Sequence, residues 1–124
     1  MSRHDVSCRA MADRDPAAEL PLTPALFHVL LSLADGEKHG YAILKEVEQR
    51  TDGTVSLSTG TLYGIIKRLL ADGMVRESAT GSDHRRTAYR LTAFGRKVAL
   101  AEAERLRDLV KSARAKKLLA DLAG

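Results

Sequence analysis

The sequence is short of cysteine and of long apolar runs, and each shortage excludes a class of protein. The single cysteine, Cys8, has no partner for an intramolecular disulfide, so we expect a reducing, cytoplasmic compartment. No apolar stretch approaches the roughly 20 residues of a membrane span. Charged residues occupy the N-terminus, where a signal peptide needs an apolar run. These absences predict a soluble protein that has no membrane partner.

Residue patterns that carry catalysis are also missing from the sequence. The histidines at positions 4, 28, 39 and 84 are scattered along the chain, and there is no glycine-rich phosphate loop. His4 and Cys8 are four residues apart, but two ligands alone are weak support for a metal site. We therefore expect no enzymatic activity, no metal and no cofactor.

The composition fits one globular domain with a slight excess of positive charge. The chain has 124 residues, of which 44% are hydrophobic, so it can form one core but is too short for two ordinary domains. Its 20 Lys and Arg residues outnumber 16 Asp and Glu residues, which gives a net charge of +4. This balance is compatible with a nucleic-acid partner but does not require one.

Residues 1–21 mix Arg, Asp, Ala and Pro without a period. We expect a tail without fixed structure, as is common at chain ends. A basic arm that enters a DNA groove is the less favoured alternative, because acidic residues balance the arginines of this segment.

Three helices are predicted after the tail, at about residues 23–35, 40–50 and 58–72. In these segments apolar residues recur at steps of three and four, which is the spacing of one helix face. An Asp-Gly pair follows each segment and would end the helix. The residues that can cap the first and third helices are Thr23, Ser58 and Thr59. The residues expected on the apolar face of the second helix are Tyr41, Leu44 and Val47, with Ile43 beside them.

Two strand-like segments and a long helix follow. Met74–Ser78 and Thr87–Thr92 have the pattern of short strands, and turn residues lie between them. The residues after Thr92 are good helix formers, so we expect one helix that runs to about Ala120.

This order of elements is that of a winged helix-turn-helix domain, in which the hairpin loop is the wing and the third helix is the recognition helix. The predicted fold class is therefore mainly α with a small β-hairpin. We assign residues 22–92 to the winged helix-turn-helix domain and residues 93–124 to a C-terminal dimerisation helix.

The third helix carries the pattern that indicates DNA binding. Its apolar stripe faces inward, so small and basic residues lie on the opposite face. Small residues let a helix backbone lie close to a groove wall, and Lys and Arg side chains can reach phosphates or guanine edges. The helix start adds N–H groups that favour a phosphate. The predicted DNA contacts on this helix are Ser58, Thr59, Gly60, Thr61, Tyr63, Gly64, Lys67 and Arg68.

The hairpin loop and the residues after it carry a second basic signal. Between residues 84 and 97 there are five Lys or Arg residues and no Asp or Glu. We predict that Arg85 and Arg86, at the wing tip, contact the phosphate backbone or the minor groove. The alternative is a loop whose charges lie in water. An amphipathic helix with two outward basic residues is likewise common in proteins that bind no DNA.

The final helix has an apolar side and is longer than a three-helix domain needs for cover. A helix of about 25 residues is about 38 Å long, so pairing with a second subunit is favoured over packing on its own domain. A twofold dimer would place two recognition helices about one DNA turn, roughly 34 Å, or a multiple of it apart. The predicted dimerisation residues are Leu26, Phe27, Leu30, Val98, Leu106, Leu109, Val110 and Ala113.

The order and spacing of several short motifs resemble the PadR family of bacterial transcriptional regulators. The motifs are Leu22-Thr23, His39-Gly40-Tyr41-Ala42-Ile43, Gly60-Thr61-Leu62-Tyr63, Gly73-Met74-Val75 and Tyr89-Arg90-Leu91-Thr92-Ala93-Phe94-Gly95. The single C-terminal helix is similar to the shorter branch of the family, in which that helix and the first helix build the dimer.

The resemblance implies a repressor that binds double-stranded DNA at a two-fold symmetric operator and is often released by a small ligand. Gly64 stands where the family commonly has proline, and the chain lacks the tryptophan with which some short-branch members hold flat drugs. Phe27 and Phe94 could stack on such a ligand, but core positions are expected for both. The alternative function is a winged helix that binds a protein and no DNA.

Overall fold

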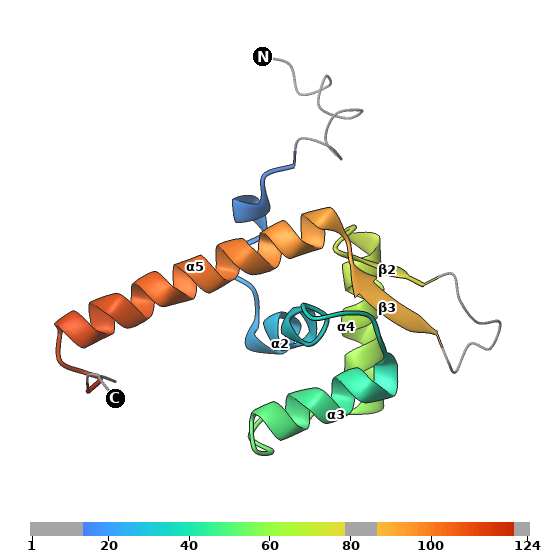
Figure 1. Ribbon diagram of the computed structural model, residues 1–124, viewed down its shortest axis with the longest axis horizontal. Coiled ribbons are helices and arrows are strands. Elements are labelled where there is room, and N and C mark those ends of the chain that lie inside the picture. Colours follow the sequence, from blue (N-terminus) through green and yellow to red (C-terminus); the bar gives the residue numbers. More distant parts are fainter. Residues whose placement is uncertain (1–13, 79–86, 121–124) are drawn as a thin grey trace, which may run out of the picture.

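Figure 1 shows the computed structural model, which describes residues 14–78 and 87–120. The predicted order of three helices, a hairpin and a long final helix is confirmed. The elements in chain order are η1 (Pro16–Glu19), α2 (Pro24–Ser32), β1 (Lys38–His39), α3 (Gly40–Arg50), α4 (Thr59–Ala71), β2 (Val75–Glu77), β3 (Ala88–Leu91) and α5 (Ala93–Ala115). This is a winged helix-turn-helix domain followed by a long C-terminal helix.

The starts of α2, α4 and α5 are fixed by hydroxyl side chains. In each case the hydroxyl oxygen of the residue before the helix accepts an N–H of the first turn, which has no acceptor within the helix. The bonds are from Leu26 N to Thr23 Oγ1 at 3.2 Å, from Thr61 N to Ser58 Oγ at 3.0 Å and from Gly95 N to Thr92 Oγ1 at 2.9 Å. The helix starts are therefore local features of the sequence.

The sheet has three antiparallel strands in the order β1-β3-β2. β2 and β3 form the hairpin, with Val75 opposite Leu91, and β1 pairs with the other edge of β3 through Lys38 and Tyr89. The sequence does not predict β1, because two residues are too few to show the alternation of a strand. β1 leads directly into α3, so the sheet fixes where α3 begins.

The core lies between α2, α3, α4 and the first half of α5, and the sheet covers one side of it. Leu62, Ile66 and Leu69 from the predicted stripe of α4 are fully or almost fully buried. Each buried aliphatic side chain of this size contributes about 1.5–3 kcal/mol to folding. The other buried apolar residues are Leu26, Val29, Leu30, Leu33, Ile43, Val47, Met74, Val75, Ala88, Tyr89 and Val98.

The second half of α5 extends away from the helical body (Figure 1). The helix ends at Ala115, before the predicted end near Ala120. Lys117 has a positive φ of 64°, and the N–H of Leu118 donates to the carbonyl of Ala113 at 2.9 Å, which is how many helices close. The sequence hides this end because helix-forming residues continue beyond it.

The prediction of a tail without fixed structure is wrong for residues 14–20. η1 packs against α5, and Asp15 caps η1 by accepting the N–H of Ala17 at 3.0 Å. Arg14 donates to the backbone oxygen of Asp72 at 2.7 Å. Residues 1–13 lie outside the described part of the chain. The order of the segment comes from contacts with distant parts of the chain, which a local pattern cannot reveal.

Candidate nucleic-acid interface

The outward face of α4 is exposed along its whole length, as the sequence predicts. Its glycines leave a smooth surface, because a Cβ built on Gly60 or Gly64 meets nothing within 4 Å. The helix backbone is therefore open to a partner at two positions one turn apart. The exposed residues of this face and its N-terminal cap are Ser58, Thr59, Gly60, Thr61, Tyr63, Gly64, Lys67 and Arg68.

Two hydroxyl groups organise the N-terminal end of α4. Ser58 Oγ donates to Thr61 Oγ1 at 2.9 Å and accepts the Thr61 N–H, so both side chains are held against the first turn. The first N–H groups of a helix have no intrahelical acceptor, and the helix dipole adds a partial positive charge there. This end of α4 has the features that bind an anionic oxygen.

The two cations of α4 differ in their surroundings. Arg68 lies 3.6 Å from the carboxylate of Asp72, one turn later on the same helix, and remains 67% exposed. Lys67 is exposed and has no ion pair within residues 14–78 and 87–120. Lys67 is therefore the cation on this face that is open to a new anionic partner.

Tyr63 has a structural contact that its position in the sequence does not reveal. Its hydroxyl lies over Gly40, where a Cβ would overlap the phenol oxygen, so a larger residue at position 40 would require the Tyr63 ring to shift. Burial raises the pKa of Tyr89 on β3, and the nearby Tyr63 and Glu77 raise it further. Tyr63 thus contacts the start of α3 from α4, and still exposes 42% of its surface.

The start of α3 adds residues that the sequence interpretation assigned to the core. Tyr41 was expected on the apolar face, but it is 70% exposed, and the ammonium of Lys45 lies 5.9 Å from its ring centroid. Val47 of the expected face is buried, and so is Ile43 beside it. The face expected from Tyr41, Leu44 and Val47 is therefore wrong at Tyr41. The Gly40-Tyr41 start of α3 was visible as a motif, but hydropathy alone assigned Tyr41 to the buried side of the helix.

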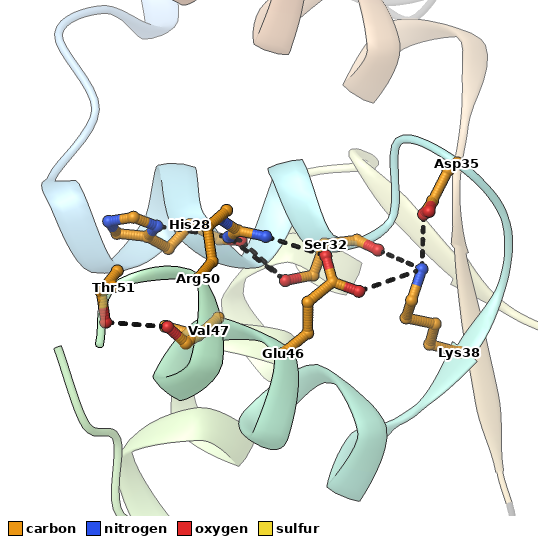
Figure 2. A network of polar contacts seen from close by, with 8 residues as sticks. All are labelled: His28, Ser32, Asp35, Lys38, Glu46, Val47, Arg50 and Thr51. Atoms are coloured by element: carbon orange, nitrogen blue, oxygen red, sulfur yellow. Dashed lines mark hydrogen bonds and ion pairs between the residues drawn. The ribbon is translucent and has the colours of Figure 1, made fainter. Parts of the chain in front are cut away.

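A network of polar contacts holds α3 against α2 and thereby fixes the frame of the helix-turn-helix (Figure 2). Arg50 on α3 donates to the backbone oxygen of His28 at 2.9 Å and to Glu46 at 2.8 Å. Lys38 donates to the backbone oxygen of Ser32 at 2.6 Å and lies 3.5 Å from the same glutamate. Two cations from outside α2 therefore meet its negative C-terminal end.

The described base of the wing is basic on one face. Arg76 on β2 and Arg90 on β3 lie directly opposite each other, and both are exposed. Like charges in such a cross-strand pair repel each other, so an anion between them would relieve the repulsion. The predicted wing-tip contacts, Arg85 and Arg86, lie outside the described residues.

The predicted dimerisation residues fall into two groups. Leu26, Leu30 and Val98 lie in the core of the single chain, with exposures of 5%, 0% and 0%, so their assignment to a dimer surface is wrong. Apolar residues recur at helical spacing both in a protein core and at a dimer interface, so the sequence could not tell core residues from interface residues. The residues that keep surface open to a partner are Phe27, Leu106, Leu109, Val110 and Ala113.

Two shallow apolar grooves lie along the contact between α2 and α5. One of ≈ 360 Å³ is lined by Phe27, Leu31 and Leu106 among others, and one of ≈ 330 Å³ contains Leu31 and Leu100. Glu102, 1% exposed, borders the first groove. Its carboxylate accepts Arg105 Nε at 2.6 Å, Arg105 Nη2 at 3.0 Å and the Leu22 N–H at 3.1 Å. These bonds, those of Arg105 first, lower the pKa of Glu102.

The comparisons with known proteins assign this arrangement to a family. The family described as "Transcriptional regulator PadR-like family" matches residues 29–101. The transcriptional regulator Rv3488 of Mycobacterium tuberculosis is 33% identical over 85 residues, which are 68% of this chain and 77% of the relative. The chain belongs to the PadR-like family of transcriptional regulators. The resemblance carried by the short motifs is therefore confirmed. Transcriptional regulators of this family are not typically enzymes.

Solved structures share the PadR-like fold. A transcriptional regulator from Clostridium thermocellum is 30% identical, with a TM-score of 0.63, and the match covers 73% of this chain and 89% of that one. Bacillus subtilis PadR in complex with operator DNA is 22% identical, with a TM-score of 0.56, over 69% of this chain and 47% of that one. The second likeness shows the fold.

No helix in the described parts of the chain is long and apolar enough to cross a bilayer.

Proposed function

We propose that the chain is a sequence-specific DNA-binding repressor, and that it binds as a homodimer to an inverted-repeat operator with α4 in the major groove. The outward face of α4 carries the proposal, because it combines open backbone at Gly60 and Gly64 with the exposed cations Lys67 and Arg68. Close approach and positive charge are what the phosphate-lined major groove requires. A similar fold in Bacillus subtilis PadR was solved with operator DNA.

Contacts to the phosphate backbone would come from the elements beside α4. Tyr41 and Lys45 expose a hydroxyl and an ammonium at the start of α3. Arg76 and Arg90 expose two guanidinium groups on the hairpin. Such contacts position a protein on DNA, whereas contacts of α4 to base edges select the sequence. We extend the same positioning role to Arg85 and Arg86 at the wing tip.

A second copy of the chain is proposed as the partner of α5. Leu109 and Val110 are exposed on the part of the helix that leaves the body, and the grooves between α2 and α5 are apolar. A helix from a second subunit would cover both and bring two copies of α4 onto successive half-sites. A small, mainly apolar effector that enters the same space would change the spacing of the two α4 helices and release the DNA.

Footprinting tests this function. The purified protein should protect an inverted repeat in the region upstream of its own gene, and protection should be lost as salt is raised. The competing function, a winged helix that binds only proteins, predicts weak and equal binding to all fragments. That result, obtained with folded protein and with no effector added, would reject the DNA-binding proposal.

A further inference from the structure

The turn after α4 is a junction at which three parts of the chain meet. The backbone oxygen of Asp72 accepts a bond from Arg14, and that of Gly73 accepts the Thr92 hydroxyl at 2.6 Å. The backbone oxygen of Met74 accepts the Thr92 N–H at 3.0 Å. Three successive carbonyls are thus held from outside α4, two by Thr92, the residue before α5, and one by the N-terminal segment.

Arg14 contacts both sides of this junction. Its guanidinium carbon lies 4.0 Å from the centroid of the Phe94 ring in the first turn of α5, which is the geometry of a cation–π contact. Its Nη1 donates to Asp72 at 2.7 Å, and Nη2 pairs with Glu19 at 3.3 Å. The side chain is only 23% exposed. The flat guanidinium therefore links the end of α4 to the start of α5.

The location of Arg14 separates this role from direct DNA contact. Its Nη1 acts at the C-terminal end of α4, where a cation meets the negative end of the helix dipole. The Arg14 side chain packs closely against Gly73 of the turn, since a Cβ on Gly73 would lie 3.3 Å from Nη1. Nη1 and Nη2 each donate to a group of the chain itself, a carbonyl and a carboxylate, and the Phe94 ring lies against the guanidinium. Arg14 is thus arranged to hold the helix and not to meet a phosphate.

We propose that Arg14 is a positioning residue for DNA binding, through which residues 14–20 fix the angle between the recognition helix α4 and the helix α5. The proposal rests on the proposed function, because it concerns how α4 is presented to the groove. α5 carries the dimer contact in that function. A fixed angle between the two helices then sets the distance between the recognition helices of the two subunits. A looser angle lowers the fraction of protein whose two α4 helices fit the operator together.

Arg14→Ala tests the proposal, with two readouts. In the free protein, amide hydrogen exchange should become faster at Asp72, Gly73 and Met74 while the melting temperature changes little. Operator affinity should fall by about tenfold, which corresponds to the loss of about one charge-assisted hydrogen bond. The slope of log affinity against log salt should stay unchanged, because no phosphate contact is removed. Arg14→Lys should recover part of the affinity.

The matched control is Arg107→Ala, which removes the same charge from an exposed side chain of α5. It should leave both the exchange and the affinity unchanged. Unchanged exchange at the end of α4 in Arg14→Ala would overturn the proposal. So would a salt slope reduced by about one, which would indicate a phosphate contact. A lower melting temperature with unchanged affinity would show a structural role alone and would also overturn it. If wild-type protein protects no DNA, the proposed function fails, while hydrogen exchange still reports whether Arg14 holds the end of α4.

Discussion

Glycine has two opposite uses in this chain. At Gly95 a side chain is excluded, because its Cβ would overlap the backbone oxygen of Met74, so α5 crosses the turn after α4 at close range. At Gly64 a Cβ would meet nothing within 4 Å, although glycine weakens a helix interior by about 1 kcal/mol relative to alanine. The free protein gives no packing reason for Gly64, and close approach of α4 to DNA supplies one.

Gly64→Ala should therefore separate folding from binding. The free energy of unfolding should rise by about 0.5–1 kcal/mol, because alanine favours the helix and fills open space. Operator affinity should fall, because the new methyl group stands between the helix and the groove wall. Denaturant unfolding and a binding titration measure the two effects. A variant that gains stability and binds DNA as tightly as wild type would place the groove away from this face.

Individual residues differ in how far the sequence predicts them. Thr23, Ser58 and Thr92 act as caps because the cap is a local bond, and local bonds follow from neighbouring residues. Tyr41 and Leu30 depend on what lies beside them in space. Hydropathy identifies both as apolar, but it cannot tell an exposed tyrosine from a buried one or a core leucine from an interface leucine.

At the scale of elements, the long periodic helices were predictable and the short pieces were not. α3 and α4 bury one face each, so their periods appear in the sequence. β1 forms because it pairs with the edge of β3, and η1 forms because it packs against α5. Such segments carry no period of their own. The contact between α2 and α3 is also non-local, since Arg50 reaches His28 across 22 positions.

The contact between Arg50 and His28 makes the stability of the protein depend on pH. Burial, followed by the charge of Arg50, lowers the pKa of His28 below its ordinary value of 6.5. The unfolded chain therefore binds this proton more readily, so stability is constant above that value and falls as the pH drops below it. His28→Gln should remove this part of the fall, measured by thermal melts between neutral pH and pH 5. The pKa of Glu102 is also lowered, so protonation of Glu102 causes a further loss of stability that begins at lower pH. That loss should remain in the variant. Identical pH profiles for the two proteins would contradict the assignment.

At the scale of the whole molecule, the exposed apolar part of α5 is explained by a second subunit. Leu106→Arg combined with Val110→Arg should give monomers in light scattering, because two buried charges in the proposed interface would be strongly unfavourable. Operator affinity should fall with it, since only a dimer engages both half-sites. Glu104→Arg, which adds charge on another face of α5, is the matched control and should stay dimeric. If the double variant remains a dimer, the interface is formed by other residues than Leu106 and Val110.

The central claim is that the outward face of α4 reads DNA, and Lys67→Ala tests it most directly. The measurement is the affinity of this variant for the footprinted operator and for operators with single base changes, next to Lys111→Ala, which removes the same charge far along α5. We predict that Lys67→Ala weakens binding by about 1–3 kcal/mol and loses discrimination at particular base positions. Lys111→Ala should bind as wild type. An unchanged base preference in Lys67→Ala would contradict the claim.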